Sequence, residues 1–139
     1  MAFVVDASMA AAWFLPDEQN QASDRVMDGL ISGPGQVPSL FWFETRNLFL
    51  MAERRGRLRP GEAFLSMTQL RGLPLQDQGS GGDQLVLTLA AKHALSGYDA
   101  SYLALAVQMA LPLATTDKRL SVAARLEAVQ ILGPLAGVA

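Results

Sequence analysis

The sequence predicts an α/β fold, with a mostly parallel central sheet between two layers of helices. Short contiguous apolar runs, which are typical of strands buried on both faces, alternate with longer segments that have helical spacing or capping signals. Glycine and proline separate these segments, and we find no internal repeat and no long linker. Such alternation is typical of three-layer α/β/α domains, because each connection between parallel strands needs a crossover helix.

Length and composition predict a single domain over residues 1–139. Of these 139 residues, 50% are hydrophobic and 17% are charged, which favours a compact core over disorder. The net charge of −2 gives no overall attraction to nucleic acid, so binding of that kind needs a local basic patch.

The same composition excludes several kinds of site. The chain has no cysteine, which removes disulfides, thiolate zinc sites and cysteine nucleophiles. Its one histidine, His93, disfavours a His-dependent triad and is interpreted as structural or exposed. No apolar run reaches the ~20 residues of a membrane span, and Asp6 ends the N-terminal run too early for a signal peptide. We therefore expect a cytoplasmic protein without a membrane anchor.

The first half of the chain begins with a buried strand, the apolar run that ends at Asp6. Ser8 is suited to cap the helix that follows, and Pro16 stops that helix. The acidic pair Asp17-Glu18 suits the start of the next helix, and Ser39 is a further cap beyond the turn at 33–35. The expected strands here are 2–6 and 36–38, and the expected helices are 9–14, 17–31 and 40–54.

The second half of the chain repeats the pattern. Gly56 and Pro60 interrupt the chain before a further helix, and the proline in 73–75 is tolerated in an edge strand. A glycine-rich loop leads to Asp83, the predicted N-cap of a helix that Gly97 separates from the next one. The expected strands are 73–75, 111–115 and 129–132, and the expected helices are 61–70, 84–93, 98–109 and 119–127.

Four acidic residues interrupt or end the most apolar segments of the chain: Asp6, Glu44, Asp99 and Asp117. Sites on parallel sheets form beyond the carboxyl ends of the strands, which puts Asp6 and Asp117 at the same edge. An unpaired buried carboxylate is costly, and a shared divalent cation removes that cost. We therefore predict that the four acids line one pocket.

Each acid also has a purely structural explanation. Glu44 lies four residues from both Leu40 and Leu48, so it shares an apolar helical stripe, and it is the hardest of the four to explain by structure alone. Asp99 lies in the first turn of its helix, where the helix dipole favours a negative charge. Asp6 alone is consistent with a turn and Asp117 alone with a cap. Their joint placement is what favours a common site.

An oxygen-only pocket selects hard cations, Mg²⁺ or Mn²⁺, and such ions support displacement at a phosphodiester. Ser8 and Thr115 place hydroxyl oxygens close by, although serine and threonine at cap positions are more often only caps. Lys118 and Arg119 lie beside the predicted pocket and are candidates for contact with RNA phosphates. The arginines between 54 and 59 are denser, but a solvated helix end explains them better.

Four segments of the chain resemble PIN-domain ribonucleases, and most closely the VapC toxins of bacterial toxin–antitoxin pairs. The segments are residues 4–8, 38–44, 95–106 and 113–120. The resemblance implies that Asp6, Glu44, Asp99 and Asp117 form a metal-binding catalytic cluster, with Asp6 and Asp99 as the most direct ligands. It also implies a role for Thr115, two residues before the last acid. Many members carry a further acid just beyond that position, where this chain has Lys118, Arg119 and Leu120.

The function that this resemblance implies is that of an Mg²⁺- or Mn²⁺-dependent endoribonuclease toxin. It further implies a homodimer, an RNA substrate and a small antitoxin partner. Two alternatives remain: a PIN-domain RNA-processing nuclease outside a toxin–antitoxin pair, and a non-catalytic PIN-like binding module. The compact length favours the toxin over the processing enzyme, and the presence of all four acids favours an enzyme over the binding module. A haloacid-dehalogenase phosphatase is disfavoured, because Ser8 stands where such an enzyme needs a second aspartate.

Overall fold

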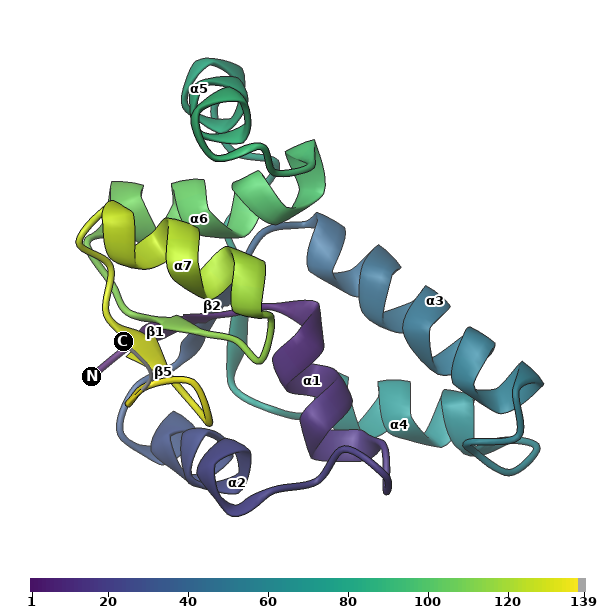
Figure 1. The fold of residues 1–139 in the computed structure, drawn as a ribbon. Helices are drawn as coiled ribbons and strands as arrows, with labels where there is room; N and C mark the ends of the chain where they lie inside the picture. The colour runs from purple at the N-terminus through teal and green to yellow at the C-terminus, as the bar shows by residue number, and fades with distance from the viewer. Residues whose placement is uncertain (138–139) are drawn as a thin grey trace.

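The computed structural model describes residues 1–137 and has a five-stranded parallel sheet at its centre (Figure 1). The strands are β1 (Phe3–Val5), β2 (Gly35–Val37), β3 (Leu75–Asp77), β4 (Leu113–Ala114) and β5 (Ile131–Leu132). They lie in the order β3-β2-β1-β4-β5, and every neighbouring pair is parallel. The predicted α/β fold class and parallel sheet are therefore confirmed.

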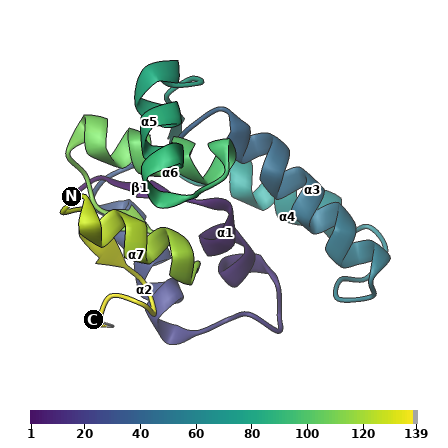
Figure 2. The same cartoon turned by 45° about the horizontal axis from the view of Figure 1, so that its top comes forward.

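Helices cover this small sheet. They are α1 (Ala7–Phe14), α2 (Gln21–Asp28) with the 3₁₀ turn η1 (Gly29–Ile31), α3 (Leu40–Arg54), α4 (Glu62–Arg71), α5 (Asp83–His93), α6 (Gly97–Met109) and α7 (Lys118–Leu126). In Figure 1, α6 and α7 lie above the strands and α2 lies below them. Helices α3 and α4 project together to one side of the molecule, as Figure 2 also shows.

The core explains the contiguous apolar runs of the sequence. Val4 and Val5 of β1 are both completely buried, because β1 is the central strand and helices cover both faces of the sheet. The edge strand β3 is instead largely exposed, as its proline-containing sequence predicts. Among the largest fully buried side chains are Phe41 and Phe49 of α3 and Tyr102 of α6. These residues fix the two helices that approach the carboxyl ends of the strands.

Two predicted helix starts are wrong. Helix α2 begins at Gln21, capped by Asn20, and not at Asp17. Asp17 and Glu18 lie in the preceding turn, where both pair with Arg57. Asp83 is the first residue of α5, and Gly82 is its N-cap.

Ser8 is likewise not the predicted N-cap of α1. That helix starts at Ala7, and the Asp6 side chain caps it. The two strands predicted to contain a proline also differ from expectation. Strand β3 begins only after Pro74 and is displaced along the chain, whereas β4 begins only after Pro112 and is shorter than expected. Both prolines lack an N–H group, yet their carbonyl oxygens still accept bonds from Gly35 N and Val4 N, respectively.

The turn after β5 depends on Gly133, which has a positive φ of 109°. A Cβ atom at this position would lie 2.8 Å from Met9 Cε, and Met9 is completely buried in α1. Both the backbone angle and the packing therefore select glycine here.

We predict that Gly133→Ala lowers the free energy of unfolding by about 1–3 kcal/mol, since alanine is strained at this angle. Urea titration followed by circular dichroism measures the change. Gly97→Ala is the control, because a Cβ at Gly97 meets no atom within 4 Å and Gly97 lies in a helix. Equal urea midpoints for the two variants would show that the turn tolerates a side chain.

Candidate active site

The candidate site is built around Asp6, which ends β1 and caps α1. Its Oδ1 accepts hydrogen bonds from Met9 N (2.9 Å) and Ser8 Oγ (2.7 Å), and its Oδ2 accepts one from Thr115 Oγ1 (2.5 Å). The residue is only 4% exposed. Asp6 is thus a buried carboxylate held by three donors from two separate parts of the chain.

Burial raises the pKa of the Asp6 carboxyl to about 6. The hydrogen bonds from Thr115, Ser8 and Met9 oppose this shift, and the nearby charge of Asp117 adds to it. The charged form is therefore destabilised in the folded protein despite its three donors. A cation beside the carboxylate would offset that destabilisation.

The tips of β1 and β4 are joined by a network of hydroxyl groups. The strands are parallel neighbours, so their carboxyl ends meet. Ser8 Oγ accepts from Thr116 N (2.9 Å), and Thr115 Oγ1 accepts from Asp117 N (3.0 Å). Asp117 in turn caps α7 by accepting from Leu120 N (3.1 Å), which confirms its predicted capping role. The same contacts that shape the two helix starts hold Asp6 and Asp117 at one edge.

Glu44 reaches this edge from α3 and is partly buried. Tyr102 of α6, itself 1% exposed, donates a hydrogen bond from Oη to Glu44 Oε1 (2.5 Å). Burial raises the pKa of Glu44, the Tyr102 hydroxyl lowers it, and the charge of Asp99 raises it again. Sequence reasoning missed this role of Tyr102. The available signal was its position three residues after Asp99, on the same helical face.

Asp99 lies in the first turn of α6, as predicted. Ser96 caps this helix, since Ser96 Oγ accepts a hydrogen bond from Asp99 N (3.0 Å). The Asp99 carboxylate is therefore not the cap of this helix. Burial is the largest cause of its raised pKa, and the charge of Asp117 is the next. The guanidinium of Arg119 acts in the opposite direction. Asp99 therefore faces the β4–α7 junction.

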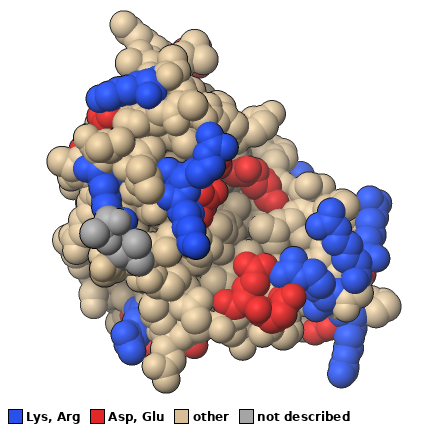
Figure 3. Space-filling view, in the orientation of Figure 1, with Lys and Arg blue, Asp and Glu red and all other residues tan. Residues whose placement is uncertain are grey.

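The four acids share one electrostatic neighbourhood. Asp117 raises the pKa of both Asp6 and Asp99, and Asp99 raises that of Glu44. Figure 3 shows acidic side chains gathered in a hollow of the molecular face, with basic side chains along one side. Within residues 1–137, however, no three Asp, Glu or His side chains are close enough to hold a metal ion as they stand. Chelation of one ion by three of them thus requires side-chain movement.

The donor set nevertheless fits a hard divalent cation. Carboxylate and hydroxyl oxygens are the groups present at this edge, which suits Mg²⁺ or Mn²⁺. Burial raises the pKa of Asp6, Glu44 and Asp99, so a positive charge among them would be stabilising.

Comparison with known proteins identifies the fold family. The family model described as PIN domain matches residues 3–126, which is most of the chain. The chain belongs to the PIN-domain family. The resemblance seen in the sequence is thereby confirmed over a continuous stretch that includes Asp6, Glu44, Asp99 and Asp117.

This PIN domain is also similar to individual proteins. It is 30% identical over 125 residues to ribonuclease VapC3 of Pyrobaculum aerophilum, covering 87% of this chain and 93% of the relative. Its fold matches PAE2754 of the same organism with a TM-score of 0.68 and 22% identity, covering 92% of this chain and 90% of the other. It matches VapC20 of Mycobacterium tuberculosis, a toxin that cleaves the sarcin–ricin loop, with a TM-score of 0.60 and 17% identity. This match covers 87% of this chain and 94% of the other. The fold also matches FitAcB of Neisseria gonorrhoeae with a TM-score of 0.63 and 18% identity, covering 96% of this chain and 98% of the other.

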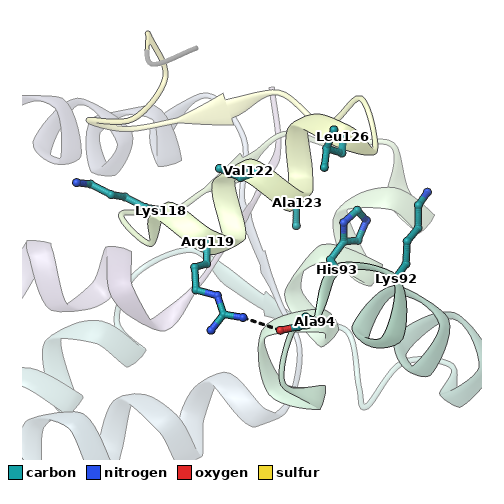
Figure 4. A pocket seen from close by; sticks show the side chains of 8 residues that line it. All are labelled: Lys92, His93, Ala94, Lys118, Arg119, Val122, Ala123 and Leu126. Atoms are coloured by element: carbon teal, nitrogen blue, oxygen red, sulfur yellow. Dashed lines mark hydrogen bonds between the residues drawn. The ribbon is translucent and has the colours of Figure 1, made fainter.

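The two predicted substrate-binding residues of the PIN domain lie side by side but point differently (Figure 4). Arg119 donates from Nη2 to the Ala94 carbonyl at the end of α5 (2.6 Å). Lys118 points away from the cavity of about 520 Å³ that lies between α5 and α7. Both side chains are exposed. Arg119 is thus partly structural, whereas Lys118 is free to meet a ligand.

Other ionisable groups of the domain have structural roles. His93 is buried and its Nε2 lies 2.6 Å from Glu127 Oε2, which agrees with the structural interpretation of this histidine. Arg57 binds both oxygens of Asp17 and also contacts Glu18, so this arginine fastens the α3–α4 turn to the α1–α2 loop. Among residues 1–137 no helix combines the length and the apolar character needed to cross a membrane.

We predict that Asp6→Asn stabilises the metal-free protein at neutral pH. The folded-state pKa of about 6 lies above the ordinary aspartate value of 3.8, so the charge on Asp6 lowers stability as pH rises from about 4 through 6. The variant should gain on the order of 3 kcal/mol at pH 7 and nothing near pH 4. Urea titrations in EDTA across this pH range measure the difference. A constant difference at all pH values would contradict the assignment to Asp6.

Proposed function

We propose that this PIN domain is an Mg²⁺- or Mn²⁺-dependent endoribonuclease and acts as the toxin of a toxin–antitoxin pair. The observation that carries the proposal is the buried Asp6 carboxylate, held by three donors at the sheet edge, where the charge of Asp117 acts on both Asp6 and Asp99. The similarity to a protein named as a VapC ribonuclease supports the same activity.

Asp6 and Asp99 would hold the cation directly, with Glu44 and Asp117 completing its surroundings. When bound, the metal ion lowers the pKa of a coordinated water and neutralises charge on the phosphodiester. Neither Ser8 nor Thr115 is a substitute nucleophile in this proposal, because both hydroxyls already donate to Asp6. Their role is to fix the direction of its carboxylate.

Tyr102 has the corresponding role for Glu44. Its hydroxyl is buried, and the neighbouring carboxylates raise its pKa, so it stays protonated and remains a donor. Lys118 and Arg119 lie at the basic side of the hollow, where they would contact phosphates on either side of the cleaved bond. The pair adds a local positive charge that the net charge of the chain does not supply.

The two alternatives differ in how well the site supports them. A PIN-domain RNA-processing nuclease outside a toxin–antitoxin pair would use the same acids, and only the biological partner distinguishes it. A non-catalytic binding module has no need for a buried, desolvated Asp6 with three donors, because an unused buried carboxylate only destabilises the fold. The site therefore favours the nuclease.

We predict that purified protein cleaves total cellular RNA with Mg²⁺ or Mn²⁺ and loses this activity in EDTA. Asp6→Asn and Asp99→Asn should each reduce the rate by at least about a hundredfold, since each removes a charged ligand from the metal site. The readout is mapped 5′ ends. The matched control is Asp28→Asn, which changes an exposed acid on α2.

Two results would contradict this mechanism. One is full activity in EDTA after exhaustive dialysis. The other is unchanged cleavage by both site variants when circular dichroism shows that they remain folded.

We also propose a homodimer in the cytoplasm that a small antitoxin neutralises. Exposed apolar side chains on α4, among them Phe64 and Leu65, support contact with another chain. Expression of the active protein alone should arrest growth, and co-expression of a short protein encoded beside its gene should restore growth. Sedimentation at micromolar concentration tests the dimer. A strict monomer would refute the dimer, and harmless expression of the active enzyme would refute the toxin.

A further inference from the structure

A cavity of about 470 Å³ opens between α3 and the first turn of α6, next to the acidic site. Its lining residues are Leu40, Phe43, Glu44, Asn47 and Tyr98. The four residues from α3 have the spacing i, i+3, i+4 and i+7, so they form one face of that helix. The volume lies within the range of about 300–1,000 Å³ that is usual for small-ligand sites.

Two aromatic rings in this cavity are exposed to solvent. Phe43 is 64% exposed and Tyr98 is 67% exposed. Four other rings pack in pairs instead, Phe14 with Phe49 and Phe41 with Trp42. Each exposed ring also directly precedes an acid of the site, Phe43 before Glu44 and Tyr98 before Asp99. The rings are therefore available to a ligand that reaches the acidic site.

We propose that this cavity binds a nucleobase of the RNA, next to the phosphodiester that is cleaved. The proposal rests on the proposed ribonuclease function and adds a base-binding subsite to it. Single-stranded RNA is recognised mainly by bases that stack on aromatic side chains and hydrogen-bond through their edges. The cavity offers both kinds of contact.

The charge of the cavity lining favours a nucleobase of the RNA over its phosphates. The lining contains the Glu44 carboxylate and neither lysine nor arginine. A phosphate would be repelled there, whereas a neutral heterocycle is not. Lys118 and Arg119 are instead exposed at the start of α7, directly after Asp117. An RNA strand that crosses the acidic site thus meets rings beside Glu44 and cations beside Asp117.

Asn47 gives the cavity a means to distinguish bases. Its exposed carboxamide both donates and accepts hydrogen bonds, which matches the mixed edge of a nucleobase. The Arg46 guanidinium lies over the Phe43 ring, 5.3 Å from its centroid, and restrains that ring. The aromatic contacts supply affinity for any base, and Asn47 supplies the preference among bases.

The experiment begins with an oligoribonucleotide that contains a cut mapped with wild-type protein on total cellular RNA. Phe43→Ala and Tyr98→Ala should each lower kcat/KM about ten- to a hundredfold, mainly through KM, as expected for loss of one stacking contact. Tyr98→Phe keeps the ring and should keep the activity. Ile31→Ala is the control, since Ile31 is a 91% exposed apolar residue on η1, outside this cavity and away from α3 and α4.

A substrate with abasic sites next to the cut provides the second arm. Wild type should lose at least as much activity on the abasic oligonucleotide as Phe43→Ala loses on the normal one, because loss of the base removes the contacts of Phe43, Tyr98 and Asn47 together. Phe43→Ala should lose less than wild type when the base is removed, because one of these contacts is already absent from the variant. Asn47→Ala should broaden the bases found beside mapped cuts without removing cleavage.

The outcomes separate this proposal from the ribonuclease function. If wild type cleaves no RNA with Mg²⁺ or Mn²⁺, the function itself fails. If wild type cleaves, but Phe43→Ala and Tyr98→Ala cleave the same positions at the same rate, only the base subsite is refuted. Losses that are equal on normal and abasic substrates, together with a loss of dimer in sedimentation, would show that the cavity binds protein and would also overturn the proposal.

Discussion

The burial of the Asp6 carboxylate is the constraint on which the site depends. Water is replaced around it by Ser8, Thr115 and the backbone of Met9, and these three donors fix the start of α1 against the end of β4. The desolvation that raises its pKa also makes the edge attractive to a cation. The same burial therefore lowers the stability of the metal-free protein and raises the affinity of the site for a cation. Such a trade-off between stability and function is common at functional sites.

Sequence predicted the sheet well because its evidence is local. Apolar runs such as Phe3–Val5 and Leu113–Ala114 are recognisable without knowing their partners, and α3 was predicted with its observed ends. Boundaries failed where the deciding contact is distant. Asp17 looks like a helix start, but its pairing with Arg57, 40 residues away, keeps it in a turn. No local pattern contains that information.

In the candidate site, too, the local features were predicted from the sequence and the contacts between distant residues were not. Strand ends and the spacing on α3 were enough to single out Asp6, Glu44 and Asp117 as a group. The hydrogen bond from Tyr102 to Glu44 joins residues that are 58 apart, so it is visible only once α3 and α6 are placed together. The cavity beside Glu44 is likewise a product of two helices. The sequence was enough to predict which acidic residues belong to the candidate site, whereas the fold was needed to find the hydroxyl groups that orient their carboxylates.

The separation between Asp6 and Thr115 also orders events during synthesis. Their hydrogen bond spans 109 positions of the chain, and β1 pairs with β4 across nearly the same interval. A ribosome that has made only the first hundred residues shown here carries β1 and β2 without β4, and so lacks Thr115 and Asp117 altogether. Domains complete such long-range pairings late. The nascent polypeptide thus emerges without the acidic edge, which is completed only after the segment from Leu113 to Asp117 has been translated.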